Sequence, residues 1–140
     1  MNAYLDTSVL VTMFTRDSHS ERVRAWLPAS LTRLTLSDWT LTEFTSALGV
    51  GVRFGRLDRS EAAGAEAALD EWCQTGAVVV PVTNSDVQEA RQIIGRSGEP
   101  LRGPDALHIA IAQRLGCALA SLDVGLVRAT TALGLPVEPI

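Results

Sequence analysis

Four acidic residues lie at positions from which their carboxylates could together bind one or two divalent cations. They are Asp6, Glu43, Asp105 and Asp123. Asp6 directly follows the apolar run Ala3 to Leu5, and Asp123 directly follows the run Ala118 to Leu122. Carboxylate oxygens bind hard ions such as Mg²⁺ or Mn²⁺ in preference to zinc or copper. Because such an ion lowers the pKa of a bound water, the predicted chemistry is metal-assisted hydrolysis of a phosphodiester.

The chain has no lysine that could neutralise these carboxylates, which favours a bound divalent cation. All 12 basic residues are arginine. Carboxylates a few ångströms apart resist ionising together, and a divalent cation relieves that repulsion. The absence of lysine also excludes a P-loop, which needs a Lys on the phosphates, and enzymes that form a Schiff base through a Lys amine. No GxSxG motif of a serine hydrolase is present.

The position of an acid does not by itself separate a ligand from a structural residue. Asp86 also follows a predicted strand and begins a predicted helix, so it competes for a place in the cluster. An acid in the first turns of a helix is commonly a dipole partner, which is the alternative for Asp105 and Glu43. Asp6 is harder to explain in this way, since a buried acid without a partner is costly. His108 lies three residues after Asp105, yet a single His in an apolar helix is commonly a core residue.

Apolar runs alternate with helical patterns along the whole chain, which predicts an α/β fold in a single domain, residues 1–140. The predicted strands are Ala3 to Leu5, Leu34 to Leu36, Ala77 to Val82, Ala118 to Leu122 and Pro136 to Ile140. Helices between them imply a parallel sheet of about five strands covered on both faces. Since each helix begins at the edge where the preceding strand ends, we expect the four acids to converge there. Thr7 and Ser121 would add hydroxyls that orient a water or a ligand carboxylate.

Caps and glycines predict where the helices begin and end. Ser18 with Glu21 and Asp58 with Glu61 fit a capping side chain followed by Glu at the third helical position. Pro104 suits the first position of the helix from Gly103 to Leu115, with Asp105 at the second. Glycines expected to end helices in the left-handed conformation are Gly55, Gly76, Gly116 and Gly134.

Composition limits the partners and the compartment. The chain has 140 residues, a net charge of −4 and no stretch approaching the ~18 apolar residues of a membrane helix. Cys73 and Cys117 form no CxxC pair and are expected to be reduced, and with only His19 and His108 a zinc site is not expected. The expectation is a cytoplasmic protein without a membrane partner. Arginines that could hold RNA phosphates, or else form solvated faces, are Arg22 and Arg24, and Arg53, Arg56 and Arg59.

Four segments carry a family resemblance. YLDTSVLV near the start of the chain is followed by TLTEFTSAL, GPDALHIAIAQRLG and ASLDVGL. In this order they resemble the PIN-domain nucleases, most closely the small VapC-type toxins of toxin–antitoxin pairs. The resemblance implies a PIN-like fold and RNA cleavage with Mg²⁺ or Mn²⁺ held by the four acids. It chooses Glu43 and Asp105 over Asp86, and it matches Thr7 and Ser121 to hydroxyl positions that often accompany the acids.

The resemblance further implies a homodimer and a cognate antitoxin that fills or covers the acidic groove. One departure is Pro104, where a small residue such as Ala is more usual, and it leaves the ligand positions unchanged. A phosphatase with Asp6 as nucleophile is disfavoured, because Asp6-Thr7-Ser8 lacks a second Asp two residues on and no lysine neutralises the phosphate. The sequence leaves open a non-catalytic module that uses the acids to bind a metal or a basic partner peptide.

Overall fold

A computed structural model describes residues 2–29 and 33–140 and confirms the predicted α/β class. In chain order the elements are β1 (Ala3–Leu5), α1 (Thr7–Phe14), α2 (Ser20–Ala29), β2 (Leu34–Ser37), α3 (Asp38–Arg53), α4 (Arg59–Thr75), β3 (Val78–Val80), α5 (Asn84–Arg96), α6 (Gly103–Leu115), β4 (Ala118–Ala120), α7 (Val124–Ala132) and β5 (Val137–Glu138). The strands lie where the apolar runs predict them, although three are shorter than the runs. Across the described residues, every helix is too short or too polar to span a lipid bilayer.

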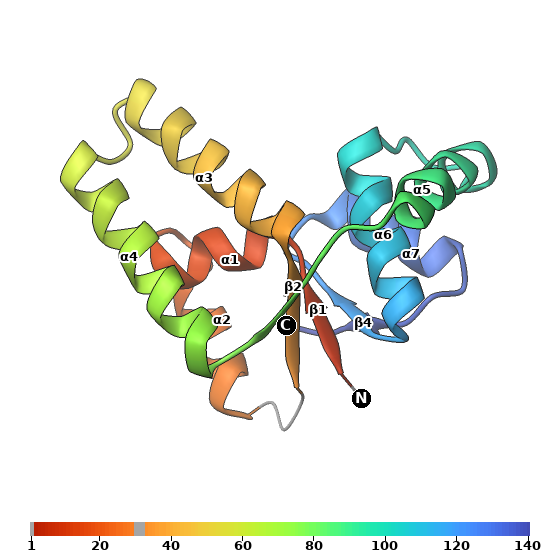
Figure 1. Cartoon of the computed structure of the whole chain (residues 1–140), viewed down its shortest axis with the longest axis horizontal. Helices are drawn as coiled ribbons and strands as arrows, with labels where there is room; N and C mark the ends of the chain where they lie inside the picture. Colours follow the sequence, from red (N-terminus) through yellow and green to blue (C-terminus); the bar gives the residue numbers. More distant parts are fainter. Residues whose placement is uncertain (1, 30–32) are drawn as a thin grey trace.

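The five strands form one parallel sheet in the order β3-β2-β1-β4-β5. After β1 the chain adds β2 and β3 on one side, and then returns to add β4 and β5 on the other side (Figure 1). The direction of winding therefore reverses between β1 and β4. In open α/β sheets, ligands bind beyond the carboxyl ends of the strands at this reversal. The residues that follow β1 and β4 thus occupy the favoured place for a site.

Two hydrophobic cores lie on opposite faces of the sheet, because successive side chains of a strand point to opposite faces. Ala3 and Leu5 of β1 pack into the core with α1, α2, α3 and α4, while Tyr4 packs into the core with α5, α6 and α7. In β4, Leu119 and Ala120 divide between the two cores in the same way. Because of this alternation, Tyr4 lies on the side of the sheet that α6 covers, and its hydroxyl contacts a side chain of α6 in the candidate site.

The capping predictions were right in one case and wrong in the other. Asp58 and Glu61 form a reciprocal capping box, with Glu61 N donating to Asp58 Oδ1 at 2.7 Å. The second helix begins at Ser20, two residues after the predicted cap Ser18. There Asp17 organises the turn, because its carboxylate accepts from His19 N at 2.8 Å and from Thr12 Oγ1 at 2.7 Å. The turn before α2 is therefore held by Asp17 and not by Ser18.

Glycine conformations were also predicted with one error. Gly55, Gly116 and Gly134 have positive φ, whereas Gly76 has φ −104. A Cβ at Gly76 would lie 2.2 Å from Trp72 Nε1, so the glycine serves close approach of the indole and not a left-handed turn. The helix α6 begins at Gly103, which places Asp105 third in the helix, not second. Cys73 and Cys117 are both free thiols, as predicted.

Candidate active site

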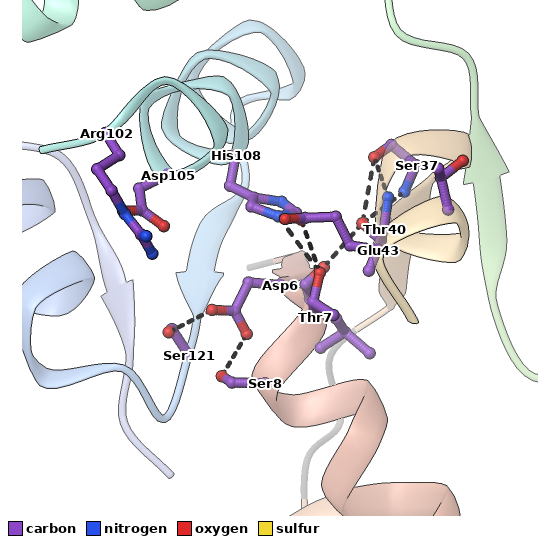
Figure 2. A network of polar contacts seen from close by, with 12 residues as sticks. Asp6, Thr7, Ser8, Ser37, Thr40, Glu43, Arg102, Asp105, His108 and Ser121 are labelled. Atoms are coloured by element: carbon purple, nitrogen blue, oxygen red, sulfur yellow. Dashed lines mark hydrogen bonds and ion pairs between the residues drawn. The ribbon is translucent and has the colours of Figure 1, made fainter. Parts of the chain in front are cut away.

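Asp6 is the buried centre of the site. It follows β1 and caps α1, with only 3% of its surface exposed. Ser8 Oγ donates to Asp6 Oδ1 at 2.6 Å, Val9 N donates to the same oxygen at 3.2 Å, and Ser121 Oγ donates to Oδ2 at 2.5 Å. Figure 2 shows the carboxylate held between Ser8 and Ser121, which come from two different elements. Both oxygens are thereby fixed in position.

The electrostatics of Asp6 are unusual for a buried acid. Burial raises the pKa of its carboxyl above the ordinary value of 3.8, although the hydrogen bonds from Ser121 and Ser8 act in the opposite direction. No arginine forms an ion pair with Asp6 among the described residues. Burying an unneutralised carboxylate is costly, and such residues are retained where a cation or a reaction needs them. Asp6 therefore has the properties of a functional acid.

Ser121 joins the ends of β1 and β4. Its hydroxyl donates to Asp6 and accepts from Asp123 N at 3.0 Å. Asp123 caps α7, where its Oδ1 accepts from Leu126 N at 3.0 Å. Backbone pairing tightens the same junction, since Asp6 N donates to Ala120 O at 3.1 Å. The predicted supporting hydroxyl thus links two of the predicted acids through one hydrogen-bonded bridge.

Glu43 reaches the site from the second turn of α3. Thr7 Oγ1 donates to Glu43 Oε1 at 2.8 Å, and His108 Nε2 forms a close ion pair with the same oxygen. Burial acts to raise the pKa of the Glu43 carboxyl, but the hydrogen bonds and charge of His108, with Thr7, outweigh it and lower the pKa. The carboxylate is therefore ionised and held from two sides. Thr7, the second predicted hydroxyl, orients Glu43 and not Asp6.

His108 is the residue whose role sequence reasoning missed. It is buried, with 3% exposed, and its Nδ1 lies 2.9 Å from the Tyr4 hydroxyl. Because the ionised Glu43 can only accept, Nε2 carries the proton on that side. On its other side, Nδ1 lies against the Tyr4 hydroxyl, whose oxygen is 2.8 Å from Ser37 Oγ. The only local signal was its spacing from Asp105; its partner Tyr4 lies 104 residues away along the chain.

The Tyr4 hydroxyl completes a buried polar chain that ends at Glu43. Besides Ser37 it contacts Thr40 Oγ1 at 3.1 Å, and these two hydroxyls also form the capping box of α3. Burial raises the pKa of Tyr4 above its ordinary value of 10.0, so the phenol stays protonated and can donate to the imidazole. One hydrogen-bonded path therefore connects the start of α3, the middle of β1 and α6. It holds the His108 ring in place, and through the ring it positions Glu43.

Asp105 lies in the first turn of α6, beside the exposed Arg102. The ion pair joins Arg102 Nε to Asp105 Oδ2 at 3.8 Å, with 86% of the arginine side chain exposed. Exposed pairs of this kind contribute little to stability, so the arginine can move to another partner. In Figure 2 both side chains lie above Asp6 and Ser121 at the same edge of the sheet. Arg102 is thus an exposed arginine at this edge that could contact a phosphate.

Asp86, the competitor for a place in the cluster, serves a separate structural purpose. Arg114 Nε and Nη2 donate to its two oxygens at 2.6 and 2.9 Å, and Thr83 N donates to Oδ2 at 2.8 Å. Burial acts to raise the pKa of the Asp86 carboxyl, but the bonds from Arg114 and Thr83 lower it overall. This acid joins α5 to α6 and is fully neutralised. The structure therefore excludes it from the site.

The remaining acids suit a hard cation in chemistry, although they form no ready cage. Over the described parts of the chain, no three His, Cys, Asp or Glu side chains come close enough together to hold a metal ion as they stand. Mg²⁺ retains several waters and is commonly bound through one or two carboxylates. An oxygen-only set around the buried Asp6 fits that requirement. A surface cavity of about 460 Å³, lined in part by Thr7, Ser8 and Asp123, opens beside it.

Comparison with known proteins supplies the family. A family model described as PIN domain matches residues 3–131, so the chain belongs to the PIN domain family. Among solved structures of similar fold is Mycobacterium tuberculosis VapC20, described as a sarcin-ricin loop cleaving toxin. It is 18% identical, with 91% of this chain and 95% of that chain covered and a TM-score of 0.73. No curated protein sequence matches the chain.

Two further structures share the fold. VapBC2 from Rickettsia felis, bound to a DNA fragment from its promoter, is 14% identical, with 99% and 98% of the two chains covered and a TM-score of 0.68. A toxin-antitoxin complex from Klebsiella pneumoniae is 16% identical, with 87% of each chain covered and a TM-score of 0.61. At these identities the likeness establishes the PIN-like fold.

Proposed function

We propose that this protein is a divalent-metal-dependent endoribonuclease that acts as the toxin of a toxin–antitoxin pair. The observation that carries the proposal is Asp6, a buried and unneutralised carboxylate at the reversal of the sheet. Membership of the PIN domain family supports a nuclease. The similarity in fold to VapC20, described as a toxin that cleaves the sarcin-ricin loop, supports RNA as the substrate.

In this proposal the metal is Mg²⁺ or Mn²⁺, and its candidate ligands are Asp6, Glu43, Asp105 and Asp123. When bound, the ion would lower the pKa of a water and stabilise negative charge on the phosphate. Ser8 and Ser121 hold the Asp6 carboxylate through their hydroxyls. Arg102, largely exposed beside Asp105, can move from that weak pair to a phosphate oxygen and position the RNA.

His108 and Thr7 act in this proposal as positioning residues for Glu43. Both place a hydrogen-bonding atom against the same carboxylate oxygen, and His108 is in turn oriented by Tyr4. Side chains that orient a ligand in this way commonly contribute about 10- to 100-fold in metal affinity or activity. The buried polar chain thus pre-forms one half of the site before the ion arrives.

The proposed partners are an antitoxin and a second copy of this chain, in the cytoplasm. Support for the antitoxin comes from the shared fold with a structure described as a toxin-antitoxin complex. A cavity of about 660 Å³ lies between α1 and the α3–α4 hairpin and is lined by Phe14, Leu48 and Leu57 among others. Its lining combines apolar residues with Arg16, Arg24 and Arg56, and it shares Val11, Asp17 and Ala47 with the smaller cavity beside the acids.

A second candidate function is a PIN-like binding module without turnover. One observation favours the form of this module that binds a basic peptide: within residues 2–29 and 33–140 the acids are not gathered into a group that could hold a metal unaided. Such a module would use the acidic edge to bind a cation or a basic peptide. It predicts binding of a metal or a basic peptide without any RNA cleavage.

Cleavage of RNA by the purified protein separates the two candidates. We expect labelled total RNA to be cut in the presence of Mg²⁺ or Mn²⁺, and cutting to stop with EDTA and return when the ion is restored. The Asp6→Asn variant, with its fold checked by circular dichroism, should not cut. If the wild-type protein binds Mn²⁺ but leaves tRNA, rRNA and mRNA intact, the binding module is the correct function.

A further inference from the structure

The tip of the α3–α4 hairpin presents a large exposed aromatic ring. Phe54 ends α3 as its C-cap residue, and 72% of its surface is exposed, the highest value among the exposed large hydrophobic residues described. The chain turns at Gly55, whose φ of 71° is readily adopted by glycine, and it then runs back into α4. In Figure 1 this hairpin extends away from the sheet. The Phe54 ring is therefore exposed to solvent at the end of the α3–α4 hairpin.

One arginine lies over this ring, and two more arginines and the acids Asp58 and Glu61 are near it in the sequence. The Arg56 guanidinium lies 5.7 Å from the Phe54 ring centroid, and Arg53 and Arg59 are exposed on either side in the sequence. No ion pair joins these three arginines to an acid in the described part of the chain. The chain as a whole carries a net charge of −4, so this cationic group stands out against an acidic background. An aromatic face beside guanidinium groups is a combination that binds unpaired nucleotides.

The tip also has a fixed relation to the candidate active site. Glu43 and Phe54 lie on the same helix, eleven residues apart, which corresponds to about 16 Å along the axis at 1.5 Å per residue. Because α3 is continuous between them, a strand of RNA bound at the tip would be held at a set distance from the acids. The tip would add affinity for the chain on one side of the cleavage point.

We propose that Phe54, Arg53, Arg56 and Arg59 form a secondary contact for single-stranded RNA. An unpaired base stacks on the Phe54 ring, and the guanidinium groups contact neighbouring phosphates. The choice of RNA rests on the proposed ribonuclease function. Charge favours RNA over a protein partner, because residues 53–59 carry three arginines against one acid, Asp58, while the chain as a whole has a net charge of −4.

The first test measures binding of a fluorescein-labelled single-stranded oligoribonucleotide of mixed sequence in EDTA, where no cleavage occurs. Phe54→Ala and Phe54→Leu should both weaken binding by about fivefold or more, and Phe54→Tyr should stay within about twofold of wild type, since stacking needs a ring. Val87→Ala, which truncates a 54% exposed residue on α5, is the matched control and should leave binding unchanged. The same sequence in duplex form should be insensitive to Phe54→Ala.

The second test separates the ring from the cations through salt dependence. Replacing Arg53, Arg56 and Arg59 together with Gln should reduce the slope of log affinity against log salt by about 2, at roughly 0.7 per phosphate contact on a single strand. Phe54→Ala should lower affinity at every salt concentration without changing the slope. Arg91→Gln, an exposed arginine on α5, is the control for charge alone.

The outcomes distinguish this inference from the proposed function. If the chain binds RNA through the tip but cuts none with Mg²⁺, the inference stands and the ribonuclease proposal fails. If the chain cuts RNA while the Phe54 and arginine variants bind as wild type does, the inference is wrong and the ribonuclease proposal stands. A Phe54→Leu variant that binds fully, with an unchanged slope in the arginine variant, assigns the surface to a protein partner. A wild-type chain that binds no single-stranded RNA also contradicts the inference.

Discussion

Asp6 and Asp86 are two buried aspartates that both lie where a helix begins after a strand, yet their surroundings are opposite. Each follows a strand, lies at the start of a helix and is almost fully buried, at 3% and 1% exposed. Asp86 is paired through both oxygens with Arg114, and its carboxyl pKa is lowered. Asp6 is held by two serine hydroxyls and one backbone N–H, and burial raises its pKa.

The difference shows what separates a structural acid from a functional one in this fold. Asp86 uses its charge entirely inside the protein, where it ties α5 to α6. Asp6 keeps its charge uncompensated at the edge where the winding of the sheet reverses, and so retains attraction for an external cation. Whether an arginine neutralises the acid separates the structural Asp86 from the functional Asp6, and the position of the acid in the sequence does not.

The largest effect is expected from removing each charge in turn. Asp6→Asn should reduce RNA cleavage by about 10²-fold or more, because a metal ligand is lost, while the free energy of unfolding stays within about 1 kcal/mol of wild type. Asp86→Asn should keep the cleavage rate and lose about 2 kcal/mol of stability, since Arg114 loses a charged partner. Urea unfolding and a cleavage assay measure the two quantities. If Asp6→Asn lost stability but kept cleavage, and Asp86→Asn lost cleavage but kept stability, the roles assigned to the two acids would be reversed.

The next largest effect is expected from the buried polar chain that positions Glu43. His108→Ala should lower cleavage by about 10- to 100-fold, as is usual for a residue that orients a metal ligand. His108→Gln, which can still donate to Glu43, should recover part of the loss, and Mn²⁺ affinity should follow the same order. A purely structural role for His108 predicts lower stability with unchanged Mn²⁺ affinity in the folded variants.

The hydroxyls that support the two aspartates give a smaller, paired prediction. Ser121→Ala removes the donor to Asp6 Oδ2 and should reduce cleavage by about tenfold. Thr83→Ala removes the cap of α5, which Asp86 completes, and should cost about 1 kcal/mol of stability with cleavage unchanged. Equal effects of the two changes on cleavage would mean that the α5 cap also serves the site.

The smallest effects are opposite pH dependences in the metal-free protein. A lowered folded-state pKa means that Asp86 contributes stability above its unfolded pKa near 3.8, and the contribution is lost as pH falls through the lower folded pKa. A raised folded-state pKa means that Asp6 favours folding when protonated, so its effect on stability becomes unfavourable as pH rises from about 3.8. Unfolding in urea with EDTA across this range should give difference curves of opposite sign for Asp6→Asn and Asp86→Asn. Difference curves of the same sign would contradict the opposite pKa shifts of Asp6 and Asp86.

Much of the fold could be predicted from local patterns. The apolar runs located all five strands, and the capping box at Asp58 located the start of α4. The errors at Ser18 and Gly76 share a cause, because the deciding contacts came from side chains that the pattern did not include, Asp17 and Trp72. Periodicity reports burial well, but it does not report which neighbour fills a given space.

The site was predictable only in part, for a related reason. The edge argument placed Asp6 and Asp123 at one edge of the sheet because parallel strands end there, and Ser121 hydrogen-bonds to the Asp6 carboxylate and to the Asp123 backbone at that edge. It could not exclude Asp86, because its partner Arg114 is 28 residues away and becomes a neighbour only when α5 packs on α6. His108 was undervalued for the same reason. The assignment of metal ligands remains a proposal that rests on the family and on the charge of Asp6.

Mn²⁺ binding to the purified protein tests the central claim most directly. Titration followed by electron paramagnetic resonance of the free ion should show binding to the wild type and to Asp86→Asn with similar affinity, provided that Asp86→Asn is kept folded at low temperature. Asp6→Asn should bind at least about tenfold more weakly, because the uncompensated carboxylate is removed. If Asp6→Asn binds Mn²⁺ as the wild type does, Asp6 is not a metal ligand and the proposed role of its free charge is wrong.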